Sequence, residues 1–271
     1  MTNVIVTGGS GLVGRHLLPL LGDAIAPDRS QLDLSQPLDL GALPGAADAV
    51  VYLAQSSRFR EWPNDNGDIH QVNVAAPLAL AEYARRAGAR HFIYASTGGV
   101  YAQSASPISE GGELAQPMSF YPASKRAGEI LLAPYAAHFT LVILRFFFVY
   151  GPGQRPDMLI PRLIGSVRDG RSIQLQGQDG LRLNPIHAED AAGAIVAALG
   201  LQQSATINVA GPEQSTLRAI AEQVGTELNR EPLFEIEQVD GSGFVADIGR
   251  MTRLLGKPTI GIASGLRTML A

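Results

Sequence analysis

Three regularly spaced glycines near the start of the chain restrict the folds open to it. Gly8, Gly11 and Gly14 follow the short β-branched run 4–6, and the apolar residues after them recur at helical spacing. Glycine permits a tight turn between a strand and a helix and lets the backbone approach a ligand closely. Because the N-terminus of a helix also presents free N–H groups to an anion, the pattern predicts a turn that binds the pyrophosphate of a dinucleotide.

Apolar strands alternate with helices along most of the chain. We expect strands at 4–6, 24–27, 49–53, 91–95, 141–146 and 206–210. Helices are expected to begin at Leu12 and to cover 72–87, 123–137 and 188–201. Continuously apolar strands that alternate with helices are typical of a parallel sheet covered on both faces. The sequence therefore predicts an α/β fold with a Rossmann-type doubly wound parallel sheet.

The regular alternation fades after Gly151, where Gly, Pro and Arg become frequent through 151–185. Further helices are expected at 216–228 and 248–255. We therefore expect an NAD(P)-binding core over 1–152, completed by about 186–210, and a smaller C-terminal substrate-binding subdomain made of 153–185 and 211–271. The sequence has no internal repeat and no low-complexity linker, so the second part is expected to pack on the first.

The composition excludes several classes of protein. Of the 271 residues, 46% are hydrophobic and 17% are charged, which is too apolar for a disordered chain. The net charge is -4 and no basic tract is long, so nucleic-acid binding is not expected. The absence of cysteine excludes thiol catalysis and Cys-ligated metal sites, and no metal site is expected. No apolar run reaches the roughly 20 residues of a membrane span, and no basic signal-peptide segment is present, so we expect a cytoplasmic protein without membrane contact.

Charged residues about 20 positions beyond the glycines are candidates for binding the ribose. Asp28 follows the expected strand at 24–27, and a carboxylate there suits the ribose hydroxyls of NAD. The alternative is an aspartate that only forms a turn. Arg29 is the residue type that holds the extra phosphate of NADP, so the choice between NAD and NADP stays open. Asp33 and Leu34 are expected near the adenine.

Tyr121 and Lys125 form a Tyr-x-x-x-Lys pair. Positions four apart on a helix share a face, and an ammonium near the phenol favours phenolate. An ordinary tyrosine titrates near ~10, so its pKa must fall for the phenol to act as a base at neutral pH. Pro122 disfavours helical geometry at Tyr121, so the pair is expected to straddle a helix start. An interfacial tyrosine with a solvated lysine is the alternative, but the position after the strand at 91–95 favours catalysis.

Hydroxyl side chains follow the expected strand at 91–95 directly, at Ser96 and Thr97. In an open parallel sheet, ligands collect at the carboxyl ends of the strands, where a hydroxyl can donate to a substrate oxygen. A capping or turn-forming role is the alternative, and spacing alone does not decide between the two. His187, which precedes an expected helix, is interpreted as structural, and the phenylalanines at 146–148 are interpreted as packing residues.

Together these residues resemble the extended short-chain dehydrogenase/reductase family, of the NAD-dependent epimerase/dehydratase type. The resemblance extends from Val4 to Met269, which is nearly the whole chain. It rests on 7–14, 51–54, Asn73, 94–101, the Tyr121 and Lys125 pair, 145–153, 185–190 and 254–256.

The resemblance implies a Rossmann domain that binds NAD or NADP and a smaller domain that binds the substrate. It makes Tyr121 the catalytic acid/base, Lys125 the residue that holds the nicotinamide ribose and lowers the phenol pKa, and Thr97 the hydroxyl that orients the substrate. The residues implied to contact the cofactor are Gly8, Gly11, Leu12, Val13, Gly14, Leu53, Ala54, Gln55, Asn73, Ser96, Tyr121 and Lys125. A homodimer through the helices at 72–87 and 122–137 is also implied.

Several positions depart from the family pattern. Nucleotide-sugar members typically have Asn where this chain has Phe148, and Arg at the position of Leu183, next to Arg182. A second Arg is expected before Asp247 and has no counterpart in 238–246. We therefore expect an NAD(P)-dependent epimerase or oxidoreductase that acts on a secondary alcohol or ketone of a small sugar-like substrate, either without a nucleoside diphosphate or with one bound in an unusual way.

Phe148 and Arg182 are candidate substrate contacts. Gly98 and Gly99 follow Thr97 where dehydratases often have Asp-Glu, which disfavours dehydration. One alternative is a nucleotide-sugar epimerase or dehydratase proper. The other is a non-catalytic NAD(P)-binding sensor, although such proteins tend to lose the Tyr or the Lys.

Overall fold

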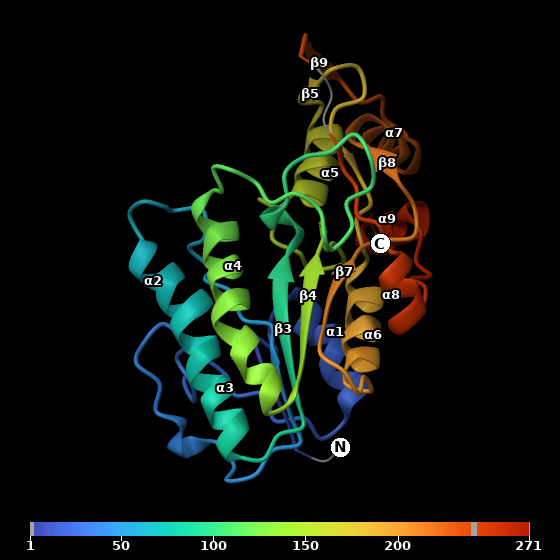
Figure 1. The fold of residues 1–271 in the computed structure, drawn as a ribbon. Helices are drawn as coiled ribbons and strands as arrows, with labels where there is room; N and C mark the ends of the chain where they lie inside the picture. The colour runs from blue at the N-terminus through green and yellow to red at the C-terminus, as the bar shows by residue number, and fades with distance from the viewer. Residues whose placement is uncertain (1–2, 240–242, 271) are drawn as a thin grey trace.

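The computed structural model describes residues 3–239 and 243–270, so residues 1–2, 240–242 and 271 of the expected units lie outside the described residues. The main sheet is parallel throughout and has the order β1-β2-β3-β4-β7 (Figure 1). These strands cover Val4–Thr7, Ala49–Tyr52, His91–Thr97, Thr140–Phe146 and Ala205–Val209. Every residue of β1 and β2 is buried, because helices cover both of their faces.

Helices on both faces of the sheet confirm the Rossmann-type doubly wound α/β fold. One face carries α1 (Leu12–Leu21) and α6 (Ala188–Ala198), and the other carries α3 (Ala76–Arg86) and α4 (Phe120–Leu132) (Figure 1). Alternate strand residues enter the two cores, with Val50, Tyr52, Phe92 and Tyr94 on the α3 and α4 side and Val6, Val51, Ile93 and Leu144 on the other.

The expectation of a strand at 24–27 is wrong in extent. This segment forms only an isolated parallel bridge between Ile5 and Ile25, where the amide of Val6 donates to the carbonyl of Ile25 at 2.8 Å. Pro27 has no N–H with which to continue the ladder. The bridge still places the segment on the side of β1 opposite to β2. The winding therefore reverses at β1, and open parallel sheets bind ligands at the carboxyl ends of the strands beside such a point.

Two helices begin earlier than the sequence predicts. The helix expected at 72–87 is preceded by α2 (Asn66–His70) and a π-helical segment, η2 (Gln71–Ala75), before α3 starts. The helix expected at 123–137 starts at Phe120 and ends in a 3-10 turn, η4 (Ala133–Ala137). Tyr121 therefore lies inside the first turn of α4, and the expectation that it precedes the helix is wrong. Pro122 is tolerated there because the first turn of a helix does not use its N–H groups.

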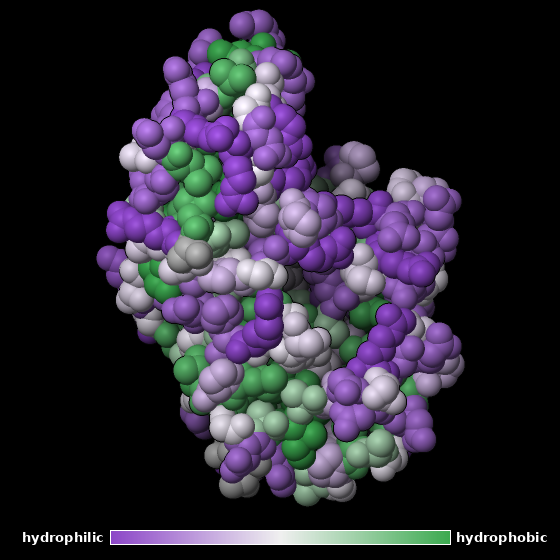
Figure 2. Space-filling view, turned by 180° about the vertical axis from the view of Figure 1, so that it is seen from behind, coloured by the Kyte–Doolittle hydropathy of each residue, from purple (hydrophilic) through white to green (hydrophobic). Residues whose placement is uncertain are grey.

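A smaller part of the molecule lies beyond the carboxyl ends of the main strands (Figure 1). It contains α5, β5, β6, β8, α7, β9, β10 and α9, which cover Leu159–Asp169, Ile173–Gln176, Arg182–Leu183, Ser215–Thr216, Leu217–Leu228, Phe234–Glu237, Gly243–Phe244 and Ile262–Leu270. Leu163, Val167, Leu175, Ile220 and Leu266 belong to its own hydrophobic core. Figure 2 shows this part from behind, projecting above the main body.

The helix α5 lies within 151–185, where the sequence analysis expected no regular element. The expected helix at 248–255 is α8 (Gly249–Leu254), whose Met251 is buried in the α1 and α6 core of the main sheet rather than in the smaller part. None of the helices in the described part of the chain is long and apolar enough to cross a membrane.

Candidate active site

Two of the three regularly spaced glycines, Gly8 in the turn after β1 and Gly14 in α1, leave no room for a side chain. Gly8 has a φ of +76°, and a Cβ there would lie 2.8 Å from the amide nitrogen of Ala54. A Cβ on Gly14 would lie 2.5 Å from the carbonyl oxygens of both Gly8 and Gly9. Gly11 is exposed at the start of α1, which has no side-chain cap among the described residues. The first N–H groups of α1 are therefore available to an anion, as the pyrophosphate of a dinucleotide requires.

The loops after β1 and β2 lie side by side. The amide of Leu53 donates to the carbonyl of Thr7 at 3.0 Å, which joins the two strand ends. The Thr7 hydroxyl oxygen is buried and has no hydrogen-bond partner among the described residues. Ala54 and Gln55 continue from Leu53 past the glycine turn. The arrangement brings Gly8, Leu53, Ala54 and Gln55 together at the carboxyl edge of the sheet.

Asp28 lies in a turn that its own carboxylate stabilises. One carboxylate oxygen accepts hydrogen bonds from the Ser30 hydroxyl at 2.6 Å, the Ser30 amide at 2.8 Å and the Gln31 amide at 3.0 Å. These bonds, the Ser30 hydroxyl first, lower the pKa of Asp28 below its ordinary value. The turn-forming alternative is therefore present in the structure, and the hydrogen bonds to the side chain of Asp28 within the described part of the chain all reach the same carboxylate oxygen.

Arg29 and Arg58 line a cavity beside this turn, together with Ser35, Gln36, Ser57 and Asp68. The Arg29 guanidinium donates to the Ser35 hydroxyl at 3.3 Å and lies 3.4 Å from the carboxylate of Asp33. Leu34 packs against the core on the α3 side rather than lining this cavity. Two guanidinium groups at the cavity fit an additional phosphate, so the structure leaves the choice between NAD and NADP open.

The three predicted catalytic side chains come from two neighbouring elements. Thr97 is the last residue of β3, and Tyr121 and Lys125 lie on α4. The Tyr121 hydroxyl donates to the side-chain carbonyl of Gln55 at 2.8 Å and also has a hydrogen bond with the Thr97 side chain. Lys125 is only 2% exposed, and its ammonium donates to the carbonyls of Ala54 at 3.2 Å and Ala95 at 3.1 Å. The structure therefore groups Thr97, Tyr121 and Gln55 above a buried lysine.

The titration behaviour of the pair differs from the expected one. Burial raises the pKa of Tyr121 to about 12, and the hydrogen bond with Thr97 acts in the opposite direction. Burial also lowers the pKa of Lys125 to about 7. The expected fall of the phenol pKa is therefore absent in the protein chain alone, and Tyr121 carries its proton at neutral pH. The neutral phenol at the carboxyl edge of the sheet can donate a hydrogen bond to a substrate oxygen.

Two residues expected near the cofactor use their side chains inside the protein. The Ser96 hydroxyl donates to the carboxylate of Glu129 at 2.5 Å. The Asn73 side chain is fully buried, donates to the Ser124 hydroxyl at 2.9 Å and accepts from the Ser56 amide at 3.2 Å. The side chains of Ser96 and Asn73 therefore connect α4 to β3 and to the segment that follows β2.

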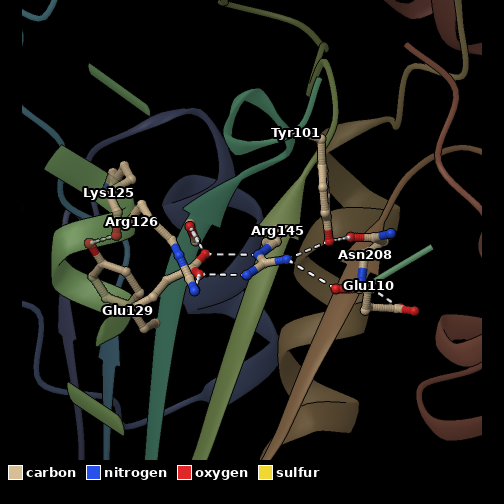
Figure 3. Close-up of polar contacts among 9 residues, drawn as sticks. Tyr101, Glu110, Lys125, Arg126, Glu129, Arg145 and Asn208 are labelled. Carbon is tan, nitrogen blue, oxygen red and sulfur yellow. Dashed lines mark hydrogen bonds and ion pairs between the residues drawn. The ribbon is translucent and has the colours of Figure 1, made fainter. Parts of the chain in front are cut away.

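A buried ion pair behind the site was missed by the sequence analysis (Figure 3). Two guanidinium nitrogens of Arg145 donate to the two carboxylate oxygens of Glu129 at 2.9 and 2.6 Å. Arg145 also donates to the Tyr101 hydroxyl at 2.5 Å, and Tyr101 donates to Asn208 at 2.9 Å. The network joins α4 to β4 and β7, so it fixes the helix that carries Tyr121 and Lys125 on the sheet. A lone arginine within an apolar strand was the available signal, because a buried charge needs a partner.

The candidate substrate contacts lie on the side of the smaller part. Phe148 has a φ of +45°, a left-handed conformation that is strained for a bulky residue, and its ring meets Phe244 edge-on at 5.9 Å. The guanidinium of Arg182 donates to the carbonyl of Ala105 at 2.6 Å, while Leu183 is fully buried. These contacts attach Arg182 and Phe148 to neighbouring protein segments rather than to the Tyr121 group.

Comparison with known proteins adds independent information. A model described as the NAD dependent epimerase/dehydratase family matches residues 4–210. The chain is 28% identical to the Uncharacterized UDP-glucose epimerase YtcB of Bacillus subtilis (strain 168), over 99% of this chain and 96% of that protein. It is 29% identical to the GDP-6-deoxy-D-mannose reductase of Pseudomonas aeruginosa, over 99% of this chain and 96% of that protein.

Solved structures match along almost the whole chain. RMD from Pseudomonas aeruginosa, complexed with NADPH, is 26% identical with a TM-score of 0.84, over 100% of this chain and 98% of that chain. The UDP-glucuronic acid 4-epimerase from Bacillus cereus, in complex with NAD, is 26% identical with a TM-score of 0.82, over 98% of this chain and 94% of that chain. The similarity therefore includes both the main sheet and the smaller part.

Proposed function

The chain belongs to the NAD-dependent epimerase/dehydratase family, and on this basis we propose that it is an NAD(P)-dependent enzyme acting on a secondary alcohol or ketone of a sugar-like substrate. The observation that carries the proposal is the grouping of Thr97, Tyr121 and Lys125 beside the glycine turn at the carboxyl edge of the sheet. Both Tyr121 and Lys125 are present, which argues against a non-catalytic sensor.

The proposed cofactor site extends from the glycine turn to Lys125. The free N–H groups at Leu12, Val13 and Gly14 suit the pyrophosphate, and Gly8 and Gly11 leave it room. Asp28 and Arg29 would meet the adenosine ribose, with Asp33 and Leu34 toward the adenine, and Lys125 would meet the nicotinamide ribose. When bound, the nicotinamide ring accepts or supplies the hydride in this chemistry.

The chain's own residues would handle the proton. In the reducing direction the Tyr121 hydroxyl gives its proton to the substrate oxygen as the carbonyl becomes an alcohol. In the oxidising direction the phenolate takes the alcohol proton, and Lys125 favours that anion from below. Thr97 would donate to the same substrate oxygen and orient it. Net reduction and epimerisation use the same groups, because an epimerase oxidises and reduces the same carbon in turn.

Gly11→Val tests the proposed cofactor site. The added side chain would stand at the exposed start of α1, where the pyrophosphate must approach, and its Cβ would be only 3.1 Å from the carbonyl of Gly8. We expect the affinity for NAD or NADP to fall more than about 100-fold, which corresponds to about 2.7 kcal/mol. Calorimetric titration with each dinucleotide measures this loss and also identifies the preferred cofactor.

Gly193→Val is the matched control, because Gly193 is exposed on α6 and a Cβ there meets nothing within 4 Å. Equal affinities for both variants and the unmodified protein would show that the site is assigned to the wrong residues.

We further propose that the substrate of this enzyme carries no nucleoside diphosphate. Two phosphate charges need paired donors, which arginine forks supply best. The structure has the fully buried Leu183 and the aromatic Phe148 at the positions where a nucleotide-sugar enzyme typically has polar groups. Arg155, one of the arginines that could supply charge instead, already binds Asp157 and the carbonyl of Ser57. Against such groups, an unpaired phosphate would lose its hydration without compensation.

We therefore expect no saturable micromolar binding of UDP-, dTDP- or GDP-sugars to the cofactor-loaded protein. Calorimetric titration with each of the three nucleotide sugars measures this directly. Micromolar binding that Arg182→Ala abolishes would contradict the expectation and support a nucleotide-sugar epimerase instead. Arg168→Ala, on the exposed side of α5, is the control for the loss of one positive charge.

A homodimer in the cytoplasm is the remaining part of the proposal. The helices α3 and α4 lie side by side on one face of the molecule (Figure 1). On α4, Ile130 and Leu131 are 55% and 45% exposed, which supports an apolar contact between two copies there.

A further inference from the structure

Gln55 is hydrogen-bonded to the hydroxyl of Tyr121, although it is not one of the three predicted catalytic residues, Thr97, Tyr121 and Lys125. Its side-chain carbonyl accepts a hydrogen bond from the phenol hydroxyl, with 2.8 Å between the two oxygens. The two residues are 66 positions apart, so the contact is formed by the fold and not by local spacing. Gln55 is exposed and Tyr121 is half-buried, and the hydrogen bond directs the side-chain amide of Gln55 to the Tyr121 hydroxyl.

The backbone on both sides of Gln55 is held by the site itself. The preceding carbonyl, of Ala54, accepts from the ammonium of Lys125 at 3.2 Å. The following amide, of Ser56, donates to the buried side chain of Asn73 at 3.2 Å, and the Ser56 hydroxyl is bonded to Asp68. Because these anchors come from α4 and from the helical segment before α3, Gln55 has a fixed origin relative to Tyr121.

Phe59, four residues further along, covers the other side of the phenol. Its ring centroid lies 5.0 Å from that of Tyr121, and the guanidinium of Arg60 lies 5.2 Å from the centre of the Phe59 ring. Arg60 in turn binds the carboxylate of Asp157 at 3.1 Å, on the side of the smaller part. The segment that starts at Gln55 therefore encloses Tyr121 and limits the directions in which its hydroxyl can point.

We propose that Gln55 is a positioning residue whose side-chain carbonyl keeps the hydroxyl proton on Tyr121 and directs it to the place that the substrate oxygen takes. A phenol has one proton to donate, and Thr97 can only donate to the phenol oxygen if that proton points elsewhere. A substrate carbonyl would displace the amide and receive the same proton along the same direction. The inference rests on the proposed function, and it assigns Tyr121 primarily to proton donation.

The physical consequence is a defined effect on the ionisation of Tyr121. An acceptor bonded to the neutral phenol stabilises that form and opposes ionisation. Among the described residues, Tyr94 on β3 interacts electrostatically with Tyr121, the ammonium of Lys125 lies 5.2 Å from the centre of the Tyr94 ring, and Arg60 lies behind the Phe59 ring. None of these changes when only the side chain of residue 55 is replaced.

The test is the ionisation of residue 121 in three proteins, measured without any substrate. 3-Fluorotyrosine is incorporated at position 121 as the probe. Its fluorine makes the phenol more acidic, so the phenol ionises at a lower pH than that of tyrosine. The fluorine NMR shift reports the ionisation directly. Gln55→Met keeps the length of the side chain but removes the acceptor, so the apparent pKa of the probe should fall by about 0.5–1 pH unit. Gln55→Glu should raise it by at least as much, because a carboxylate is a stronger acceptor and repels phenolate.

Gln202→Met is the matched control, because Gln202 is exposed and bonds only to the carbonyl of Gly200. It should leave the probe pKa unchanged. If Gln55→Met leaves the pKa unchanged or raises it, the amide does not accept the phenol proton and the inference is overturned. The proposed function fails separately: titrations that move as expected, in a protein that binds neither NAD nor NADP, would leave the hydrogen bond from Tyr121 to Gln55 intact but overturn the proposed enzyme and, with it, the positioning of a proton for a substrate.

Discussion

Tyr121→Phe should reduce turnover by at least the ~10²–10⁴-fold that a positioned general acid or base contributes. The substitution keeps the ring that packs 5.0 Å from Phe59 and removes only the hydroxyl. The fold should lose no more than the two hydrogen bonds of this hydroxyl, with Gln55 and with Thr97, each worth about 0.5–1.5 kcal/mol. Dinucleotide affinity should stay within a few-fold, because the proposed pyrophosphate site lies on α1. Steady-state rates and calorimetry on the same preparation separate these effects.

Tyr135→Phe is the control for this variant. Tyr135 lies in η4, at the opposite end of α4 from Tyr121, and its ring stacks on Phe139. Its loss of a hydroxyl should leave the rate unchanged. If Tyr121→Phe turns over at the same rate as the unmodified protein, another group handles the proton and the assignment of Tyr121 is wrong.

Arg145→Met should destabilise the protein by about 3–5 kcal/mol, the usual cost of removing one partner of a buried ion pair. The carboxylate of Glu129 is 1% exposed and would keep only Ser96 and the partly exposed Arg126 as partners. Burial alone would raise the pKa of Glu129, but the hydrogen bonds and charge of Arg145, together with the hydrogen bonds of Ser96 and Arg126, lower it below its ordinary value. Urea unfolding at pH 7 gives the free energy of unfolding and its slope.

Arg126→Met provides the contrast. Arg126 also binds Glu129, at 2.7 Å, but its side chain is 32% exposed, so its loss should cost no more than about 1 kcal/mol. Replacing both Glu129 and Arg145 with methionine should recover part of the stability, because no unpaired charge then remains in the core. Equal losses for Arg145→Met and Arg126→Met would contradict a structural role for the buried pair.

The main sheet could be predicted because its signals are local. Strands covered on both faces are apolar at every position, and the glycine turn between 4–6 and Leu12 fixes the order of the first strand and helix. The helix α5 had a local signal as well, since Ile160, Leu163, Ile164 and Val167 recur at helical spacing and are buried. The glycines and prolines around it hid that signal.

The site could be predicted only as far as spacing reaches. Tyr121 and Lys125 lie one helical turn apart, so their common helix follows from the sequence, whereas their roles remain predictions. The contacts that hold these residues in place cannot be predicted from spacing. Gln55 is 66 residues from Tyr121 in the sequence, and Arg145 is 16 residues from Glu129. Such contacts depend on how α4 packs on the strands, and no pattern within either segment encodes the distance between them.

The burial of Lys125 makes the site sensitive to the supply of protons as well as to ligands. With a pKa of about 7, the ammonium and the neutral amine are present in comparable amounts at neutral pH. A ligand that places negative charge or acceptor atoms beside this nitrogen favours the ammonium, and so draws a proton out of the solvent as it binds. Affinity for such a ligand must then increase as the pH falls through the neutral range, until Lys125 is fully charged before the ligand arrives. Binding and proton uptake are therefore coupled, because burial holds the pKa of Lys125 low until such a ligand arrives.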